Sequence, residues 1–270
     1  MTSTQRSDAE LAVDAVRAGM DVIRATSGEA AGRIPKGGDD FATAADIHAE
    51  HAIRSVLRAG RPDDAIEGEE LGRSGDLGRS ARLWRVDPLC GTRNFASGAG
   101  DYCTNVALCL SGTPVVSAVG DPRRHVVYWT DGVRAGALTD GGDLPLRPDA
   151  HNRIVELNAD EPWDVVTSRL LADRGLREAM TPRVSATTLA LAWVAAGHRA
   201  AYVNDGDLRE SVHFAAGIAL CRGAGCVVTD LHGDGLDSGL GLLVTADARV
   251  HDELRHHIRS VLGHADPPPR

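Results

Sequence analysis

The segment Trp84-Arg85-Val86-Asp87-Pro88-Leu89-Cys90-Gly91-Thr92-Arg93-Asn94-Phe95 decides the fold of this chain. A short apolar run at residues 83–86 leads into it and predicts a strand. A carboxylate, Asp87, and a thiol, Cys90, follow that strand closely. Carboxylate oxygens are good ligands for magnesium, whereas a thiol is a poor one. The chemistry that this segment supports therefore depends on Cys90.

Composition excludes several classes of function. The 270 residues can bury a sizeable core, as one large domain or two closely packed ones. A net charge of −9, with both signs mixed along the chain, offers no basic stripe for a nucleic acid. No apolar run approaches the roughly 20 residues of a membrane span, and the start lacks the apolar core of a signal peptide. We therefore expect a cytoplasmic protein with a small-molecule substrate and without nucleic-acid or membrane partners.

The five cysteines are an odd number without the spacing of a disulfide framework. This pattern favours free thiols in a reducing compartment. Cys103 and Cys109 fall in or beside an apolar run, where small buried thiols are common. We expect both of them to be core residues.

Apolar periodicity predicts alternating helices and strands. A first amphipathic helix begins near Ser7 and Asp8, and a second spans about residues 45–57. Short apolar runs predict strands at 83–86, 105–110, 115–119 and 125–130. The turns between them, Ser111-Gly112 and Asp121-Pro122, favour antiparallel neighbours.

Beyond Arg147 the pattern alternates between strand and helix. It predicts strands at 154–157, 201–203, 227–229 and 240–244, and helices that begin at Pro162 or span 189–196, 208–224 and 251–262. Residues 72–78, rich in glycine and serine, are expected to form a mobile loop. Helices interleaved with two groups of strands predict a layered α/β architecture. We expect halves at 1–147 and 148–270 that form effectively one compact unit.

The opening segment resembles the signature of the inositol monophosphatase superfamily, W-x-(I/V)-D-P-(L/I)-D-G-T-x-N-F, with Cys90 at the second aspartate. Four further family-like motifs follow the family order and spacing over about residues 8–262. They are Asp40-Phe41-Ala42-Thr43-Ala44-Ala45-Asp46, Ile66-Glu67-Gly68-Glu69-Glu70, Ser185-Ala186 and Ser211-Val212-His213-Phe214-Ala215-Ala216-Gly217. The resemblance implies a layered α-β-α-β-α sandwich of the inositol monophosphatase and fructose-bisphosphatase type.

The resemblance also implies magnesium-dependent hydrolysis of small phosphate monoesters, in which cations neutralise the phosphate and activate a water. A first metal ion would be held by Glu69, Asp87 and the carbonyl of Leu89. Thr92 would help to position the water, and Asp46 would lie beside the metals.

The same resemblance assigns residues to the phosphate and the substrate. Backbone amides from Gly91 onward, at a helix start, would receive phosphate oxygens together with Thr92. Lys36 would lie near the phosphate, and Ser185 would line the substrate pocket. Family members are commonly homodimers, so the resemblance implies a homodimer.

The second metal site departs from the family pattern. Its ligands would be Asp87 and the residues at positions 90 and 213, where the chain has Cys90 and His213 instead of carboxylates. Losing two negative charges weakens the binding of a divalent cation. We expect magnesium to bind with reduced affinity and ordinary phosphatase activity to be weak or lost. Because two ligands of one metal lie close together, Cys90 and His213 should face each other.

Three alternatives remain open for this pair. A cysteine at a helix start beside an imidazole can have a lowered pKa and act as a nucleophile, with Asp87 or Asp46 orienting His213. The same side chains could hold zinc or iron, which accept soft and borderline ligands. Drift could also have left a metal-free, noncatalytic binder.

Overall fold

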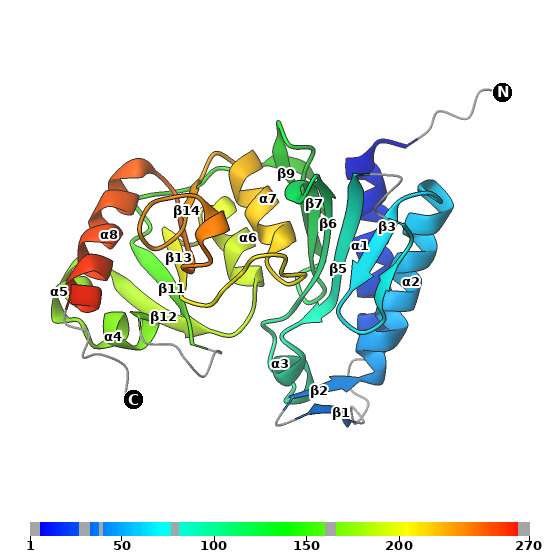
Figure 1. Ribbon diagram of the computed structural model, residues 1–270, viewed down its shortest axis with the longest axis horizontal. Coiled ribbons are helices and arrows are strands. Elements are labelled where there is room, and N and C mark those ends of the chain that lie inside the picture. The colour runs from blue at the N-terminus through cyan, green and yellow to red at the C-terminus, as the bar shows by residue number, and fades with distance from the viewer. Residues whose placement is uncertain (1–5, 27–32, 38–39, 77–80, 160–165, 264–270) are drawn as a thin grey trace. The chain divides into compact units, whose positions relative to one another are not determined.

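The computed structural model describes residues 6–26, 33–37, 40–76, 81–159 and 166–263. The chain divides into two compact units, and most of their elements are labelled in Figure 1. Unit 1 comprises Met1–Leu146, Thr187–Ala192 and Glu210–Ala224, and unit 2 comprises Arg147–Ala186, Trp193–Arg209 and Gly225–Arg270. Two short segments of the second half thus belong to the first unit. The expectation that the halves behave as one compact body stays a prediction.

An eight-stranded sheet forms the centre of unit 1, in the order β10-β9-β8-β7-β6-β5-β3-β4. Its strands are β3 (Ala65–Gly68), β4 (Gly72–Ser74), β5 (Arg82–Cys90), β6 (Cys103–Leu110), β7 (Thr113–Asp121), β8 (Val126–Thr130), β9 (Ala135–Thr139) and β10 (Gly142–Pro145). All neighbours pair antiparallel except β3 and β5, which are parallel. The antiparallel order predicted for β6, β7 and β8 is confirmed.

Helices cover both faces of this sheet (Figure 1). The helices of unit 1 are α1 (Asp8–Thr26), α2 (Ala44–Gly60), α3 (Thr92–Ala96) and α7 (Ala215–Gly223), and β1 (Arg33–Gly37) pairs with β2 (Asp40–Thr43). On one face, a Cβ on Gly120 of β7 would lie 2.4 Å from the sulfur of Met20 in α1. On the other face, the hydroxyl of Ser117 donates to the carbonyl of Ala216 in α7. Residues at odd and even positions of one strand point to opposite faces, so α1 and α7 lie on opposite sides.

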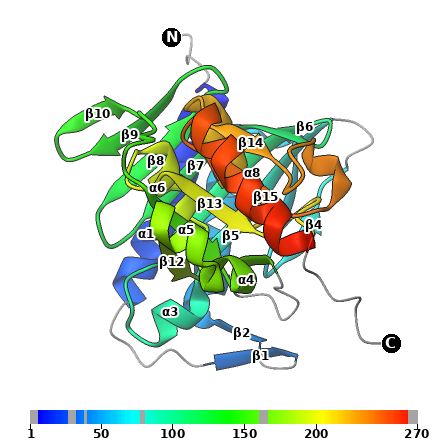
Figure 2. The same ribbon diagram turned by 90° about the vertical axis from the view of Figure 1, so that its left-hand side faces the viewer.

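Unit 2 has a five-stranded sheet in the order β12-β11-β13-β15-β14. Its elements are β11 (Ile154–Asn158), α4 (Val166–Ala172), α5 (Arg174–Ala179), β12 (Thr181–Ser185), β13 (Ala201–Asn204), β14 (Val227–Thr229), a 3-10 helix (Leu236–Ser238), β15 (Leu242–Thr245) and α8 (Ala248–Gly263), while α6 (Leu189–Ala195) begins in unit 1 and ends in unit 2. Figure 2 shows α8 lying across the strands of this sheet. Leu254 and Ile258 of α8 are buried against Leu157 and Val203 of the strands. Each unit packs helices on a sheet, which confirms the layered α/β class.

Two expectations for unit 1 were wrong. The helix predicted at 208–224 begins only at Ala215, because Glu210 has a φ of +60° and the amide of His213 bonds to the hydroxyl of Ser211. Part of the expected loop at 72–78 forms the edge strand β4, which Arg54 holds through the hydroxyl of Ser74. Residues 77–80 and Pro162 lie outside the described part of the chain. Within that part, no helix is long and apolar enough to cross a membrane.

Candidate active site

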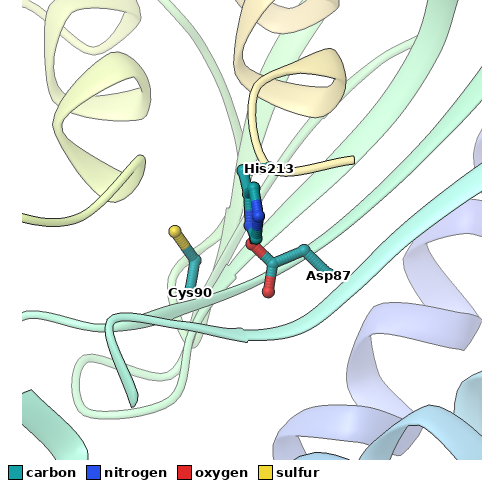
Figure 3. Close-up of side chains that lie close together, drawn as sticks. All are labelled: Asp87, Cys90 and His213. Atoms are coloured by element: carbon teal, nitrogen blue, oxygen red, sulfur yellow. The ribbon is translucent and has the colours of Figure 1, made fainter. Parts of the chain in front are cut away.

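Strand β5 and the segment before α7 bring together the side chains at the centre of the site. In Figure 3, Asp87 and Cys90 project from β5, and His213 approaches from the turn that precedes α7. One ligand atom from each of the three lies within 4.8 Å of the others. Cys90 and His213 are therefore close together, as the paired change at their positions led us to expect. A register shift between Asp87 and Cys90 marks a β-bulge, a feature that often re-aims side chains beside active sites.

His213 pairs with Asp87 rather than with the thiol. Its Nδ1 lies 2.8 Å from Oδ2 of Asp87 and 3.9 Å from Oε2 of Glu69. Burial lowers the pKa of His213, but the charge and hydrogen bond of Asp87 and the charge of Glu69 outweigh it and raise the pKa to about 9. The imidazolium therefore donates to Asp87 at neutral pH. Because the side chain is 43 % exposed, water screens this ion pair.

Asp87 is fully buried, and only one of its two carboxylate oxygens has a hydrogen-bond partner among the described residues. Burial raises its pKa, but the nearby charge and hydrogen bond of His213 more than offset this effect and hold the pKa below the usual value. Its other oxygen, Oδ1, has no hydrogen-bond partner in the described part of the chain. Buried polar atoms are rarely left without a partner unless a water or an ion is bound there. Oδ1 is thus a suitable ligand for a cation.

Glu69 adds a second carboxylate at the end of β3. Its amide donates to the carbonyl of Val86, which fixes the end of the strand next to β5. Burial and then the charge of Asp87 raise the pKa of Glu69 to about 8. Two neighbouring carboxylates repel each other when both are ionised, and a cation bound between them removes this repulsion. The ammonium group of Lys36 in β1 provides part of the positive charge beside these carboxylates, since its Nζ lies 2.7 Å from Glu69 and 2.5 Å from Glu70. Its predicted contact with phosphate stays a prediction.

Cys90 does not have the environment of a reactive thiol. The hydroxyl and amide of Thr188 donate to its sulfur at 3.0 and 3.4 Å. A hydrogen bond with Cys103, burial and the charge of Asp87 raise the pKa of Cys90 well above its usual value. The expectation of a lowered pKa was wrong, because the charge of His213 is directed to Asp87 and the thiol is only 9 % exposed.

Thr92 and Asp46 form a hydroxyl–carboxylate pair beside β5. The Oγ1 of Thr92 lies 3.0 Å from Oδ1 of Asp46 and 3.1 Å from the carbonyl oxygen of Leu89. The other carboxylate oxygen of Asp46 accepts from the amide and hydroxyl of Thr43, which caps α2. Burial raises the pKa of Asp46. Of the two aspartates considered for orienting the histidine, Asp87 is the one that bonds to it.

Gly91 permits the sharp change from β5 into α3. Its φ is +100°, and a Cβ there would lie 2.9 Å from the carbonyl oxygen of Asp101. Any other residue would be strained at this position. The remaining predicted residue, Ser185, ends β12 in unit 2. The substrate roles of Gly91 and Ser185 stay predictions.

Sequence reasoning missed the residues that support this site. Thr188 bonds to Cys90, and Asn105 donates to Thr188 at 2.8 Å and to the carbonyl of His213 at 3.4 Å. Buried Glu50 of α2 accepts from the amides of Glu70 and Leu71, and so fixes the chain just after Glu69. A carboxylate on the apolar side of a predicted helix is a signal that could have indicated Glu50. Nothing in the local sequence indicates Thr188 or Asn105.

Comparison with known proteins shows what the chain is similar to. A model of the inositol monophosphatase family matches residues 4–262. The chain is 28 % identical over 238 residues to an inositol-1-monophosphatase of Caulobacter vibrioides, covering 83 % of this chain and 90 % of that protein. It is 31 % identical over 210 residues to the Nus factor SuhB of Xylella fastidiosa, covering 74 % and 72 %. The solved structure of a Thermotoga maritima IMPase superimposes with a TM-score of 0.79 at 21 % identity, covering 94 % and 97 %. This likeness confirms the predicted fold type.

Proposed function

The chain belongs to the inositol monophosphatase family, and from that premise we propose a divergent family enzyme that acts on a small, polar, phosphorylated metabolite. In this proposal the first metal position and the hydroxyl–carboxylate pair are retained, while the second metal position is altered. Ordinary magnesium-dependent hydrolysis is then weak or lost. The observation that carries the proposal is the state of the buried Asp87 carboxylate: among the described residues Oδ1 has no hydrogen-bond partner, and Oδ2 is bound by His213.

Glu69, Asp87 and the carbonyl of Leu89 would hold a divalent cation at the first position. The unpartnered Oδ1 of Asp87 and the raised pKa of Glu69 support a fit at this position. A divalent cation held there would supply charge to neutralise the phosphate and to increase the acidity of a bound water. Thr92 would take up a proton from the attacking water while it passes its own proton to Asp46, 3.0 Å away. Burial raises the pKa of Asp46, which makes this carboxylate a better proton acceptor.

The altered position favours a different ion from magnesium. Its donors are the carboxylate of Asp87, the sulfur of Cys90 and the imidazole of His213. Magnesium binds almost entirely to oxygen, whereas zinc and ferrous iron accept sulfur and nitrogen. Three protein ligands with an open fourth position are typical of catalytic zinc sites. We therefore assign zinc or ferrous iron to this position. The metal ion would have to displace a proton from the imidazolium of His213 in order to bind.

A Cys90–His213 nucleophile receives little support. Such chemistry requires a thiolate beside its base, but the thiol has a raised pKa and the imidazole bonds to Asp87. A noncatalytic binder differs from the enzyme only in turnover, so the same assay separates the two.

A phosphate-release assay tests the proposed reaction. Purified protein is incubated with inositol 1-phosphate, sugar phosphates and nucleoside monophosphates, each with magnesium, manganese, zinc or ferrous iron. Turnover that is lost in Asp87→Asn and kept in Asp121→Asn, a buried carboxylate of β7, supports the proposal. Absence of turnover with every metal refutes the phosphatase, and substrate binding under those conditions identifies a noncatalytic binder.

We further propose a cytoplasmic homodimer. No disulfide joins any of the five cysteines, which suits a reducing compartment. Membership of the family, in which homodimers are common, supports the homodimer. Sedimentation equilibrium of the reduced protein measures the assembly directly, and a monomer at all accessible concentrations contradicts it.

A further inference from the structure

Cys90 and Cys103 are opposite one another on neighbouring strands. They are register partners across β5 and β6, directly after the β-bulge. Opposite residues of antiparallel strands have Cα atoms about 4.5–5.5 Å apart. Disulfides join residues whose Cα atoms are about 4.4–6.8 Å apart. The backbone therefore places this pair within the range that a disulfide requires.

The two side chains also point to the same side of the sheet. The Oγ1 of Thr188 lies 3.0 Å from the sulfur of Cys90 and 3.6 Å from the sulfur of Cys103. Both sulfur atoms thus lie beside the same hydroxyl. No large rearrangement is needed for their sulfur atoms to meet.

In the described part of the chain, the other three cysteines are not strand partners of a cysteine. Cys109, on the same strand as Cys103, faces Leu83 across the sheet. Cys221 lies in α7, where its thiol donates to the carbonyl of Leu191, and Cys226 directly precedes β14. Among the described residues, Cys90 and Cys103 are thus the two cysteines that face each other across neighbouring strands.

We propose that Cys90 and Cys103 form a reversible oxidation site, which closes to a disulfide by exchange with a low-molecular-weight disulfide such as oxidised glutathione. Cys90 reacts first, because it is 9 % exposed while Cys103 is fully buried. Its sulfur attacks one sulfur of the small disulfide, which forms a mixed disulfide and releases one small thiol. The sulfur of Cys103 then displaces the second small thiol. The two protons of the protein thiols end on the two released thiols, so one disulfide is reduced as another forms.

Oxidation would act on the metal position next to it. The inference for regulation rests on the proposed function, in which the sulfur of Cys90 is a metal ligand beside Asp87 and His213. A sulfur bound to Cys103 can no longer be a thiolate, and the thiolate is the form that binds metals. The reduced protein would therefore hold the soft metal ion, and the oxidised protein would release it. Exchange is slow, because a thiol with a raised pKa is rarely ionised near neutral pH.

Equilibration of the full chain in glutathione buffers of increasing oxidised fraction tests the pair. The samples are quenched by alkylation, and the peptides are mapped by mass spectrometry. We expect a Cys90–Cys103 disulfide that dithiothreitol reverses, that is absent in Cys103→Ala and that is kept in the matched variant Cys109→Ala. Circular dichroism confirms that each variant is folded. Two free thiols at the most oxidising end, or a glutathione adduct on Cys90 alone, would overturn the proposal.

Zinc titration of the reduced and oxidised protein separates this inference from the proposed function. We expect zinc affinity to fall by about tenfold or more on oxidation, since loss of an outer-shell partner alone costs that much. In Cys103→Ala the reaction stops at the mixed disulfide of Cys90, so a loss of zinc affinity in the oxidising buffer should appear there together with a glutathione adduct, and in the wild type without one. If the disulfide forms and zinc binds in neither state, the thiol pair stands and the proposed metal position fails. If zinc binds equally in both oxidation states, the regulatory role fails.

Discussion

Restoring the two missing carboxylates should restore magnesium binding. In the double variant Cys90→Asp with His213→Asp, a neutral thiol and an imidazolium become two carboxylates beside Asp87. A divalent cation about 4 Å from a unit negative charge gains about 2 kcal/mol even in a water-like dielectric, twice the value for a monovalent pair. The water-like limit is appropriate because His213 is 43 % exposed.

The net gain in magnesium-binding free energy is smaller than the sum of the gains from the two added carboxylates. Carboxylates in close proximity repel one another and therefore retain protons. A net gain of about 1.4–2.8 kcal/mol corresponds to magnesium binding about ten- to a hundredfold tighter. Isothermal titration calorimetry of magnesium on the wild type, each single variant and the double variant measures this gain. The conservative control is Cys90→Ser with His213→Asn, which removes the same side chains without adding charge.

Phosphate release in magnesium should rise with the affinity if the rest of the catalytic set is intact. Equal magnesium affinity in the wild type and the double variant, with both folded, would refute the reasoning that these two positions share one metal. Tighter binding in the control pair would show that removal of the imidazolium, rather than the added carboxylates, controls affinity.

Three further results follow from the same geometry. The folded-state pKa of Glu69 is raised to about 8 and that of His213 to about 9. The protein therefore loses the stabilising contribution of Glu69 as the pH rises from about 4.5 to 8. It loses the contribution of His213 as the pH rises from about 6.5 to 9. Metal-free protein should therefore be less stable to urea near pH 9 than near pH 5, and Glu69→Gln should flatten the profile; a rise in stability over this range would contradict both assignments. Cys90 should react with iodoacetamide near neutral pH more slowly than a model thiol, because its pKa is raised, and faster alkylation would revive the nucleophile. Glu50→Gln should cost about 3 kcal/mol of unfolding free energy in urea, because it leaves the charge of buried Arg54 without its partner, whereas a change below about 1 kcal/mol would show that water satisfies Arg54.

The sequence alone predicts the fold to the extent that local pattern and family motifs specify it. The helices near Asp8 and over residues 45–57 appear with small changes of boundary, because their apolar periodicity also defines their buried face. The helix predicted at 208–224 is too long because a pattern of apolar residues cannot reveal the positive φ of Glu210. That interruption matters for the site, since it places His213 in the turn before α7.

The proximity of Cys90 and His213 was predicted correctly, whereas the pKa shift of Cys90 was not. Shared coordination of one metal predicts that Cys90 and His213 lie close together, and they do. The pKa of Cys90 depends on Cys103 and Thr188, which reach it through strand pairing and a distant segment. The sequence alone does not show that either residue is a neighbour of Cys90, because it does not give the pairing register of the strands. The pairing of Cys90 with Cys103 could not be predicted for the same reason, because the bulge before Cys90 decides which residue of β6 lies opposite it.

X-ray absorption at the zinc edge of the reduced, zinc-loaded protein tests the central claim most directly. If Asp87, Cys90 and His213 hold the ion, the spectrum contains one sulfur neighbour at about 2.3 Å together with nitrogen and oxygen neighbours at about 2.0–2.2 Å. That sulfur neighbour should disappear in Cys90→Ser and remain in Cys109→Ala. A spectrum with only nitrogen and oxygen neighbours, or one that Cys90→Ser leaves unchanged, would contradict the account.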